Sequence, residues 1–334
     1  AAPLRSVALP GPGGLGGGEG TAIALPRLSE RAAWRLGVLA VAGLAVANLG
    51  ALDAGVASLW EFLRTKAWFR ADMWEPYVAV GSFFTWLHGW LLVDYLATSG
   101  KFGGRFSGLR KYRLQDQWAA AKKGKTVAEM KPDELPKPNR WYAGWPWELV
   151  VYLAPLFVLA HFNAFAPRRA ALEWAAPSFL TVCGQIGAGL FLYDFFFWFG
   201  HVAMHKISPR IFKWSHGKHH ENNESRASDT VRLTVLEEVV DVLCSIAALR
   251  LLQAHPISRT FYNIIITFLL VELHCGYDMP WSPQNLFPQV FAGSRRHHIH
   301  HRVGRSYFGK FFRWMDDLFG FVEKDGALKK ATKP

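Results

Sequence analysis

The chain has 334 residues, of which 51% are hydrophobic and 15% aromatic, and 38 Lys and Arg against 26 Asp and Glu give a formal net charge of +12. This composition excludes a disordered or low-complexity protein. Charged residues make up 19% of the chain, below the ~25% typical of soluble domains, which indicates that lipid covers part of the surface. Three cysteines, Cys183, Cys244 and Cys275, form neither a disulfide framework nor a CxxC metal pair.

The first segment, 1–30, is rich in Gly, Ala and Pro. It cannot bury enough apolar surface to offset the entropy of ordering, so we expect a disordered leader, with a targeting role left open. A membrane anchor is expected from 31 to 200, because four apolar stretches approach the ~20 residues that a membrane-spanning helix needs. They are 36–59, 76–97, 147–166 and 175–199. Buried helices of a soluble protein would show the same pattern.

The polar segment 98–146 separates the second and third stretches, with eleven basic against four acidic residues. By the positive-inside rule it predicts a cytoplasmic loop between two helical hairpins, with both chain termini on the cytoplasmic side. The basic charge therefore indicates membrane topology and not nucleic acid binding. Two later apolar stretches, 231–254 and 261–273, are expected as helices at the cytoplasmic surface. The catalytic region is expected at 201–322, followed by a basic tail at 323–334.

Nine of the thirteen histidines fall in four groups. They are the HxxxH pair His201 and His205, the HxxHH set His216, His219 and His220, the single His274, and a second HxxHH set, His297, His300 and His301. On a helix, residues four apart share a face, and an HxxHH motif spans an arc of about 100°. Imidazoles this close together repel when protonated, whereas a cation takes up their lone pairs. Nine nitrogen ligands predict a site for two metal ions.

Two acids are candidate partners of these imidazoles. Asp194 precedes His201 by seven residues, which returns to the same helix face, so it could accept an imidazole N–H. Asp278, four residues after His274, either orients that ring or serves as a turn residue. The sequence has neither the Glu-x-x-His pairs of soluble di-iron bundles nor cysteines with zinc-site spacing. Imidazole itself suits iron, zinc and copper alike, so the ligands do not choose the metal.

The three histidine boxes, in this order, resemble those of the fatty acid hydroxylase superfamily of membrane di-iron oxygenases. That superfamily includes sterol desaturases, sterol methyl oxidases and lipid hydroxylases. The resemblance covers about 190–320 and extends to Trp314-Met-Asp-Asp-Leu-Phe-Gly320. The run Val271-Glu-Leu-His-Cys-Gly-Tyr-Asp-Met-Pro-Trp281 is most similar to the cholesterol 25-hydroxylase branch.

The resemblance implies an all-α membrane protein of about four transmembrane helices, with a cytoplasmic helical cap holding the histidine-rich di-metal site. It implies two iron ions, O2, a sterol or fatty-acyl lipid as substrate, and location in the endoplasmic reticulum. Electrons would come from an external cytochrome b5 and its NAD(P)H-dependent reductase, since no Gly-x-Gly-x-x-Gly fingerprint is placed between a predicted strand and helix. No side-chain acid or base is assigned.

Hydroxylation of the lipid is the expected reaction. Sterol desaturase or sterol methyl oxidase chemistry within the same family stays open, because the sequence does not decide between oxygen insertion and loss of a second hydrogen. A non-catalytic membrane metal-binding or transport protein is the alternative from another class.

Overall fold

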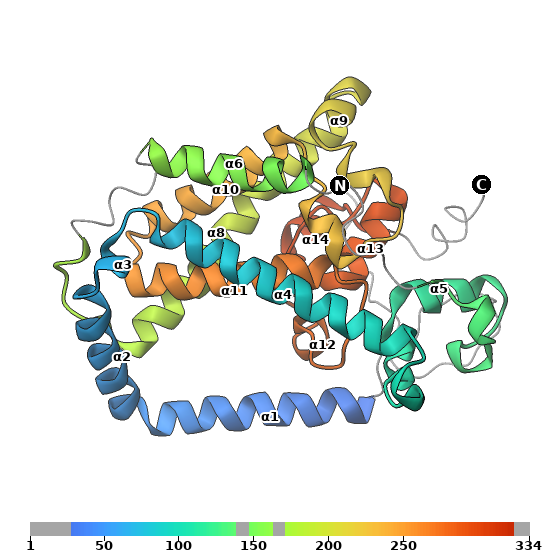
Figure 1. Cartoon of the computed structure of the whole chain (residues 1–334), viewed down its shortest axis with the longest axis horizontal. Helices are drawn as coiled ribbons and strands as arrows, with labels where there is room; N and C mark the ends of the chain where they lie inside the picture. The colour runs from blue at the N-terminus through green and yellow to red at the C-terminus, as the bar shows by residue number, and fades with distance from the viewer. Residues whose placement is uncertain (1–27, 138–146, 163–170, 324–334) are drawn as a thin grey trace, which may run out of the picture.

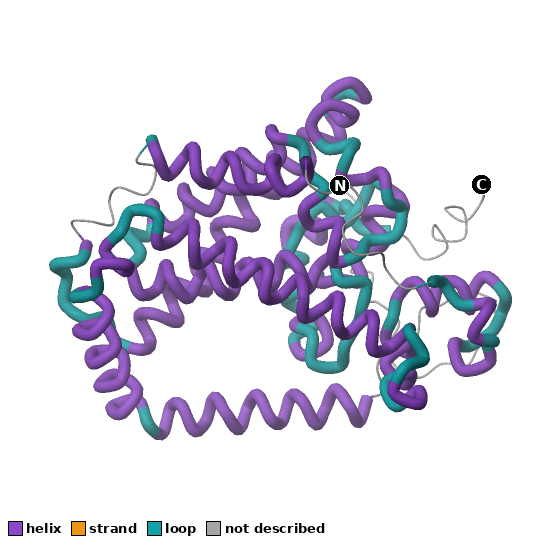
Figure 2. The backbone as a smooth tube through the Cα atoms, in the orientation of Figure 1, coloured by secondary structure: helices purple, strands orange, loops and turns teal. Residues whose placement is uncertain are grey.

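The computed structural model of the chain describes residues 28–137, 147–162 and 171–323. Within these ranges all regular structure is helical, and extended backbone pairs only in isolated bridges (Figure 2). The expected all-α class is therefore confirmed. The predicted leader lies outside the described residues except for its last three, and the predicted basic tail lies outside them except for Glu323.

Helices of fifteen residues or more form most of the molecule. They are α1 (Leu28–Ala47), α2 (Leu49–Arg64), α4 (Trp74–Thr98), α6 (Trp147–His161), α8 (Phe179–Lys206), α10 (Val235–Leu251) and α11 (Pro256–His274). The shorter α-helices are α3 (Ala67–Arg70), α5 (Leu114–Lys122), α9 (Pro209–Ser215), α12 (Pro283–Leu286), α13 (Gly293–Val303) and α14 (Trp314–Phe319). The 3-10 helices are η1 (Phe102–Gly104), η2 (Ser107–Tyr112), η3 (Val127–Glu129), η4 (Pro132–Glu134), η5 (His219–Glu221) and η6 (Ala227–Val231).

Two of the described helices, α8 and α11, are long and apolar enough to cross a bilayer. The stretch expected as one span at 36–59 is divided between α1 and α2, which are bent by 79° relative to each other and would make a third span only as a pair. The other two expected spans are helical as α4 and α6, but α6 has only 15 residues. Among the described residues the structure thus supports two or three spans, and a four-span topology stays a prediction.

Helix α11 differs most from its expected place. The stretch 261–273 is part of a 19-residue helix, because Pro256 at its first turn starts the helix earlier and His255 caps it, accepting from the Ile257 N–H. Pro suits this position, since the first helical N–H groups have no partner within the helix. The helix has the length and composition of a span, yet 67% of its apolar window is buried inside the protein.

Helix α11 lies at the centre of the long helices, in contact with α4 and α8, and α10 contacts both α8 and α6 (Figure 1). A buried ion pair fixes α11 against α4: the Arg259 guanidinium donates to both carboxylate oxygens of Glu75, at 2.7 and 2.6 Å. Such a charge is tolerated in the interior only with its partner in place. The short helices α12, α13 and α14 gather around one end of this bundle (Figure 1), which is where α11 ends at His274.

The described part of the basic segment, 98–137, packs against this same end of the bundle. Arg113, which is 1% exposed, donates to a carboxylate oxygen of Asp94 on α4 at 2.8 Å. The Leu114 N–H donates to the carbonyl oxygen of Gly276, just after α11. Part of the positive charge that the sequence suggests for a surface loop is therefore neutralised inside the protein.

Candidate metal centre

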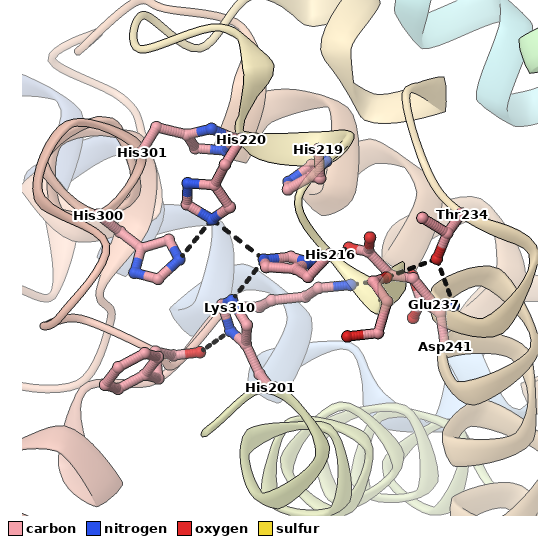
Figure 3. Close-up of polar contacts among 12 residues, drawn as sticks. His201, His216, His219, His220, Thr234, Glu237, Asp241, His300, His301 and Lys310 are labelled. Atoms are coloured by element: carbon pink, nitrogen blue, oxygen red, sulfur yellow. Dashed lines mark hydrogen bonds and ion pairs between the residues drawn. The ribbon is translucent and has the colours of Figure 1, made fainter. Parts of the chain in front are cut away.

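The structure brings all nine histidines of the predicted site together, although they come from four segments. The pair ends α8, the first HxxHH set follows α9 and enters η5, the single histidine ends α11, and the second HxxHH set lies in α13. They form two groups, and within each group one ring nitrogen from every histidine lies within 4.8 Å of those of the others. One group holds His201, His205, His216, His220 and His300, and the other holds His219, His274, His297 and His301. Figure 3 shows four rings of the first group, His201, His216, His220 and His300, turned toward one another.

A tight turn divides the first HxxHH set between the two groups. Helix α9 ends at Ser215, and its C-cap His216 has φ −141°, so His216, His219 and His220 do not share one continuous helix. The chain turns at Gly217, where a Cβ would lie 2.9 Å from the Cα of Lys213 and 3.0 Å from its carbonyl oxygen. Only glycine accepts so close an approach without a backbone shift. The turn places His219 in the group of four, while His216 and His220 lie in the group of five.

Nε2 atoms face one another throughout the cluster. In the group of five, His216 Nε2 lies 3.0 Å from His201 Nε2 and 3.1 Å from His220 Nε2. In the group of four, His274 Nε2 lies 3.1 Å from His219 Nε2 and 2.8 Å from His297 Nε2. Two imidazole nitrogens bound to one ion at about 2.1 Å and at a right angle lie about 3.0 Å apart. The observed spacings therefore fit metal coordination.

The outer nitrogens of three rings fix their protonation. Each Nδ1 lies beside a backbone carbonyl oxygen: His201 and Phe308 at 2.7 Å, His274 and Leu270 at 2.8 Å, and His300 and Ser306 at 2.7 Å. Because a carbonyl oxygen only accepts hydrogen bonds, Nδ1 carries the proton and Nε2 keeps a lone pair directed into the cluster. Such converging lone pairs repel one another unless a cation lies between them, so the donor set fits bound metal ions.

Burial keeps the imidazole rings of the cluster neutral, and the neutral imidazole is the form that binds metal. Burial lowers the pKa of His300 to about 4. Burial, together with the neighbouring rings, also lowers the pKa of the other histidines outside α8 and α11 far below its ordinary value. These are His216, His219, His220, His297 and His301. At neutral pH the cluster therefore presents lone pairs and not imidazolium charges.

Asp194 has a different role from the expected one. Its carboxylate accepts three backbone N–H groups, from Lys310 at 2.9 Å, Phe311 at 3.0 Å and Phe312 at 3.1 Å, and no described hydrogen bond joins it to an imidazole. It fixes the loop that carries the Phe308 carbonyl oxygen, the acceptor for His201. Its effect on the histidine is transmitted through the backbone.

Asp278 likewise makes no described hydrogen bond to His274. Its Oδ1 accepts from the side-chain amides of Gln284 at 3.0 Å and Asn285 at 2.8 Å, and its Oδ2 lies 2.9 Å from the Arg295 guanidinium. The side chain is 1% exposed. Asp278 therefore serves as a turn residue, as one of the two expectations had it, and it also forms an ion pair with Arg295.

Sequence analysis missed Glu237 as a histidine partner. Its Oε1 lies 2.8 Å from His216 Nδ1, within ion-pair distance although outside hydrogen-bond geometry, and its side chain together with His216 and His219 forms a third group with the spacing of metal ligands. Glu237 is 2% exposed in the first turn of α10, where Thr234 caps the helix. Paired acids at the start of an apolar helix, after a capping threonine, were the available signal.

Lys310 is the second residue that sequence analysis missed. Its Nζ donates to Asp241 at 2.9 Å and to the Tyr193 hydroxyl at 2.8 Å. Figure 3 shows its side chain extending between the histidine rings and the acids of α10. A cation is thus held beside the cluster by one carboxylate and one phenol.

The remaining histidines stand apart from the two groups. His88 and His161 are exposed, and His255 caps α11. His298 is fully buried in α13, with Nδ1 3.2 Å from the Ser225 hydroxyl.

Two pockets meet beside the cluster. The inner one is lined by five of the nine histidines, one from α8, one from α11, one from α13 and two from the first HxxHH set. The larger one lies among α4, α6, α8, α10 and α11, and its wall is mainly apolar, with Leu156, Val242, Ile246, Leu249 and Ile266. Tyr152, Asp241 and Leu270 line both pockets. An apolar ligand in the larger pocket would therefore lie next to the histidines.

Residues 186–321 match the family model described as Fatty acid hydroxylase, a range that holds all nine histidines. This part of the chain is thus a fatty acid hydroxylase domain. No solved structure matches the chain.

The chain is also similar to cholesterol 25-hydroxylases. It is 24% identical to a cholesterol 25-hydroxylase-like protein of Danio rerio, over 80% of this chain and 97% of the relative. It is 29% identical to cholesterol 25-hydroxylase of Homo sapiens, over 56% of this chain and 65% of the relative. A very-long-chain aldehyde decarbonylase of Oryza sativa subsp. japonica is 30% identical over 47% of this chain and 59% of the relative.

Proposed function

We propose that this chain is a membrane-bound, iron-dependent oxygenase that hydroxylates a C–H bond of a sterol or related lipid. One observation carries the proposal: two groups of neutral histidines adjoin an apolar pocket within the helical bundle. A lipid C–H bond is inert and insoluble in water, so it must meet its oxidant inside an apolar environment. The fatty acid hydroxylase domain supports the same conclusion.

The two histidine groups would each hold one iron ion. When bound, iron supplies the reduction of O2 by two external electrons and two protons, so that one oxygen atom enters the C–H bond and the other leaves as water. The electrons would come from a cytochrome b5-type donor and its NAD(P)H-dependent reductase.

The chain's own residues orient the ligands and exclude water. The backbone carbonyl oxygens of Phe308, Leu270 and Ser306 each hold one imidazole in a single tautomer and ring orientation, and Glu237 lies against a fourth ring. Partners of this kind raise the basicity of the ligands and fix their direction. The apolar wall of the larger pocket keeps water away from the substrate, which limits side reactions.

The proposed location is the endoplasmic reticulum, with the histidines and both termini on the cytoplasmic side. The basic segment 98–146 supports this orientation, because positive charge near membrane spans stays cytoplasmic, and its described part packs beside the histidine end of the bundle. The location also suits a soluble or membrane-anchored electron donor on that side.

A metal transporter is less well supported by the same observations. Transport sites lie near the bilayer midplane, at interrupted helices, whereas these histidines lie at the ends of α8 and α11 and in the short segments beyond them. Desaturation and sterol methyl oxidation would use the same groups of histidines, so products must separate them from hydroxylation.

The test is lipid profiling of cells that express the wild-type chain, His297→Ala, or His88→Ala, whose histidine is exposed on α4. We expect a lipid heavier by one oxygen atom with the wild type and with His88→Ala, and none with His297→Ala. A product lighter by two hydrogens would replace hydroxylation by desaturation. Identical lipid profiles for all three proteins would contradict the proposed function.

A further inference from the structure

The larger pocket carries acidic side chains where it meets the histidines. Glu238 and Asp241 both line it from α10. Asp241 accepts from the Lys310 ammonium and from the Tyr193 hydroxyl, so its charge is compensated. Other polar side chains of the wall are paired as well: the Ser245 hydroxyl lies 2.9 Å from that of Tyr262.

Glu238 differs from these neighbours. Its side chain is 2% exposed, and its Oε2 has no hydrogen-bond partner among the described residues. Burial and the nearby charge of Asp241 raise its pKa well above the ordinary value for a glutamic acid. A protonated carboxyl can donate one hydrogen bond and accept others. A buried polar group without a partner is costly, so its position on a pocket wall indicates that a ligand completes its bonding.

The pocket geometry places Glu238 at the reactive end. The preceding residue, Glu237, lies against His216, whereas Leu249 lies on the same pocket wall eleven residues further along α10. Eleven residues of α-helix extend about 16 Å. An elongated lipid aligned with this wall would therefore have one end beside Glu238 and the histidines, and its apolar body against residues such as Ile246.

We propose that Glu238 binds a hydroxyl or carbonyl oxygen of the lipid, so that the enzyme selects lipids whose oxygen lies close to the carbon that is oxidised. The closeness of this oxygen to the oxidised carbon rests on the proposed function, whereas the binding of the oxygen by Glu238 does not. It adds a specificity determinant to a pocket that is otherwise apolar. Pure hydrocarbons would fill the same pocket and leave the Glu238 carboxyl without its partner.

The binding test uses the full chain in lipid nanodiscs, without O2 or reductant. Tritiated cetyl alcohol and tritiated hexadecane, which have the same number of carbons, serve as probes, each corrected for uptake by empty nanodiscs. We expect the wild type to bind the alcohol about tenfold more tightly than the alkane, as one net hydrogen bond provides. Glu238→Gln, which keeps a neutral donor and acceptor, should retain this preference, and Glu238→Leu should lose it.

Ile246→Ala is the matched control, because it changes the same pocket wall without removing a polar group. It should weaken binding of both probes and leave their ratio unchanged. Equal affinities of the two probes for the wild type, or a preference that persists in Glu238→Leu, would overturn the proposal. The wild-type ratio is decisive even if Glu238→Leu does not fold. Since no turnover is involved, a retained preference with no lipid oxidation would refute the proposed function alone.

Discussion

Replacing Asp194 by alanine tests how the loop around residue 310 supports the histidine cluster. The carboxylate is 1% exposed and accepts three backbone N–H groups, at 2.9, 3.0 and 3.1 Å. Alanine leaves these three buried donors without acceptors, while it also removes the desolvation cost of the carboxylate itself. Breaking a buried charged interaction from one side costs about 3–5 kcal/mol. We therefore expect Asp194→Ala to shift the folding equilibrium roughly 150- to 5,000-fold.

Thermal unfolding of the purified protein at one fixed scan rate measures this loss. At about 2–4 °C per kcal/mol, the midpoint should fall by about 6–20 °C. Asp317→Ala is the control, because this residue lies on the nearby α14 with its side chain 35% exposed, paired with arginines. An exposed pair contributes at most about 1 kcal/mol. If Asp194→Ala unfolds within about 2 °C of Asp317→Ala, the role assigned to the carboxylate is wrong.

Three further outcomes are expected. Acid should destabilise the metal-free protein, because the pKa of His300 is about 4 in the folded state and 6.5 in the unfolded state. The stability that neutral His300 contributes is complete above pH 6.5 and falls by about 2 kcal/mol near pH 5. An unfolding midpoint that rises on acidification would contradict this. Glu237→Gln should weaken metal binding about 10–100-fold, measured by competition with a chelator. The control Glu221→Gln, at an exposed residue, should bind metal as tightly as the wild type. Equal metal affinities of the two variants would exclude an orienting role for Glu237. Gly217→Ala places a Cβ 2.9 Å from the backbone of Lys213 and should lower the free energy of unfolding by about 1–3 kcal/mol. Gly184→Ala, with open space around its Cβ, should leave the thermal unfolding midpoint unchanged. Equal midpoints for the two variants would argue against a tight turn at Gly217.

The histidines could be predicted because their spacing is a local property. His201 and His205 lie four apart on α8, and the last box lies on α13, so helical periodicity placed these rings correctly relative to one another. The first HxxHH set broke the pattern at Gly217, where a close backbone approach replaces the helix. Such a turn depends on contacts with the preceding helix that spacing does not reveal.

The partners of the histidines could not be predicted, because they are distant in sequence. Asp194 meets the backbone of Lys310 across 116 residues, and periodicity alone suggested a neighbour on its own helix. Glu237 lies in a largely apolar helix, and the packing of α10 against α9 brings it to His216. Long-range contacts of this kind follow from the fold.

The membrane spans were only partly predictable, because mean hydropathy does not report bends or burial. The stretch 36–59 is largely apolar, yet it bends by 79° where α1 meets α2. The stretch 261–273 is expected at the cytoplasmic surface, but as part of α11 it lies largely inside the bundle, with Arg259 neutralised by Glu75. A buried ion pair between two helices leaves no mark on either helix alone.

The central claim is that oxygen from O2 enters a lipid at the histidine cluster. The most direct measurement supplies the iron-loaded protein, in membranes with an electron donor, with O2 labelled by heavy oxygen, and follows the lipids by mass spectrometry. We predict one labelled oxygen atom in each product molecule for the wild type and no product for His297→Ala. A product without the label, or one that forms equally with His297→Ala, would contradict the claim.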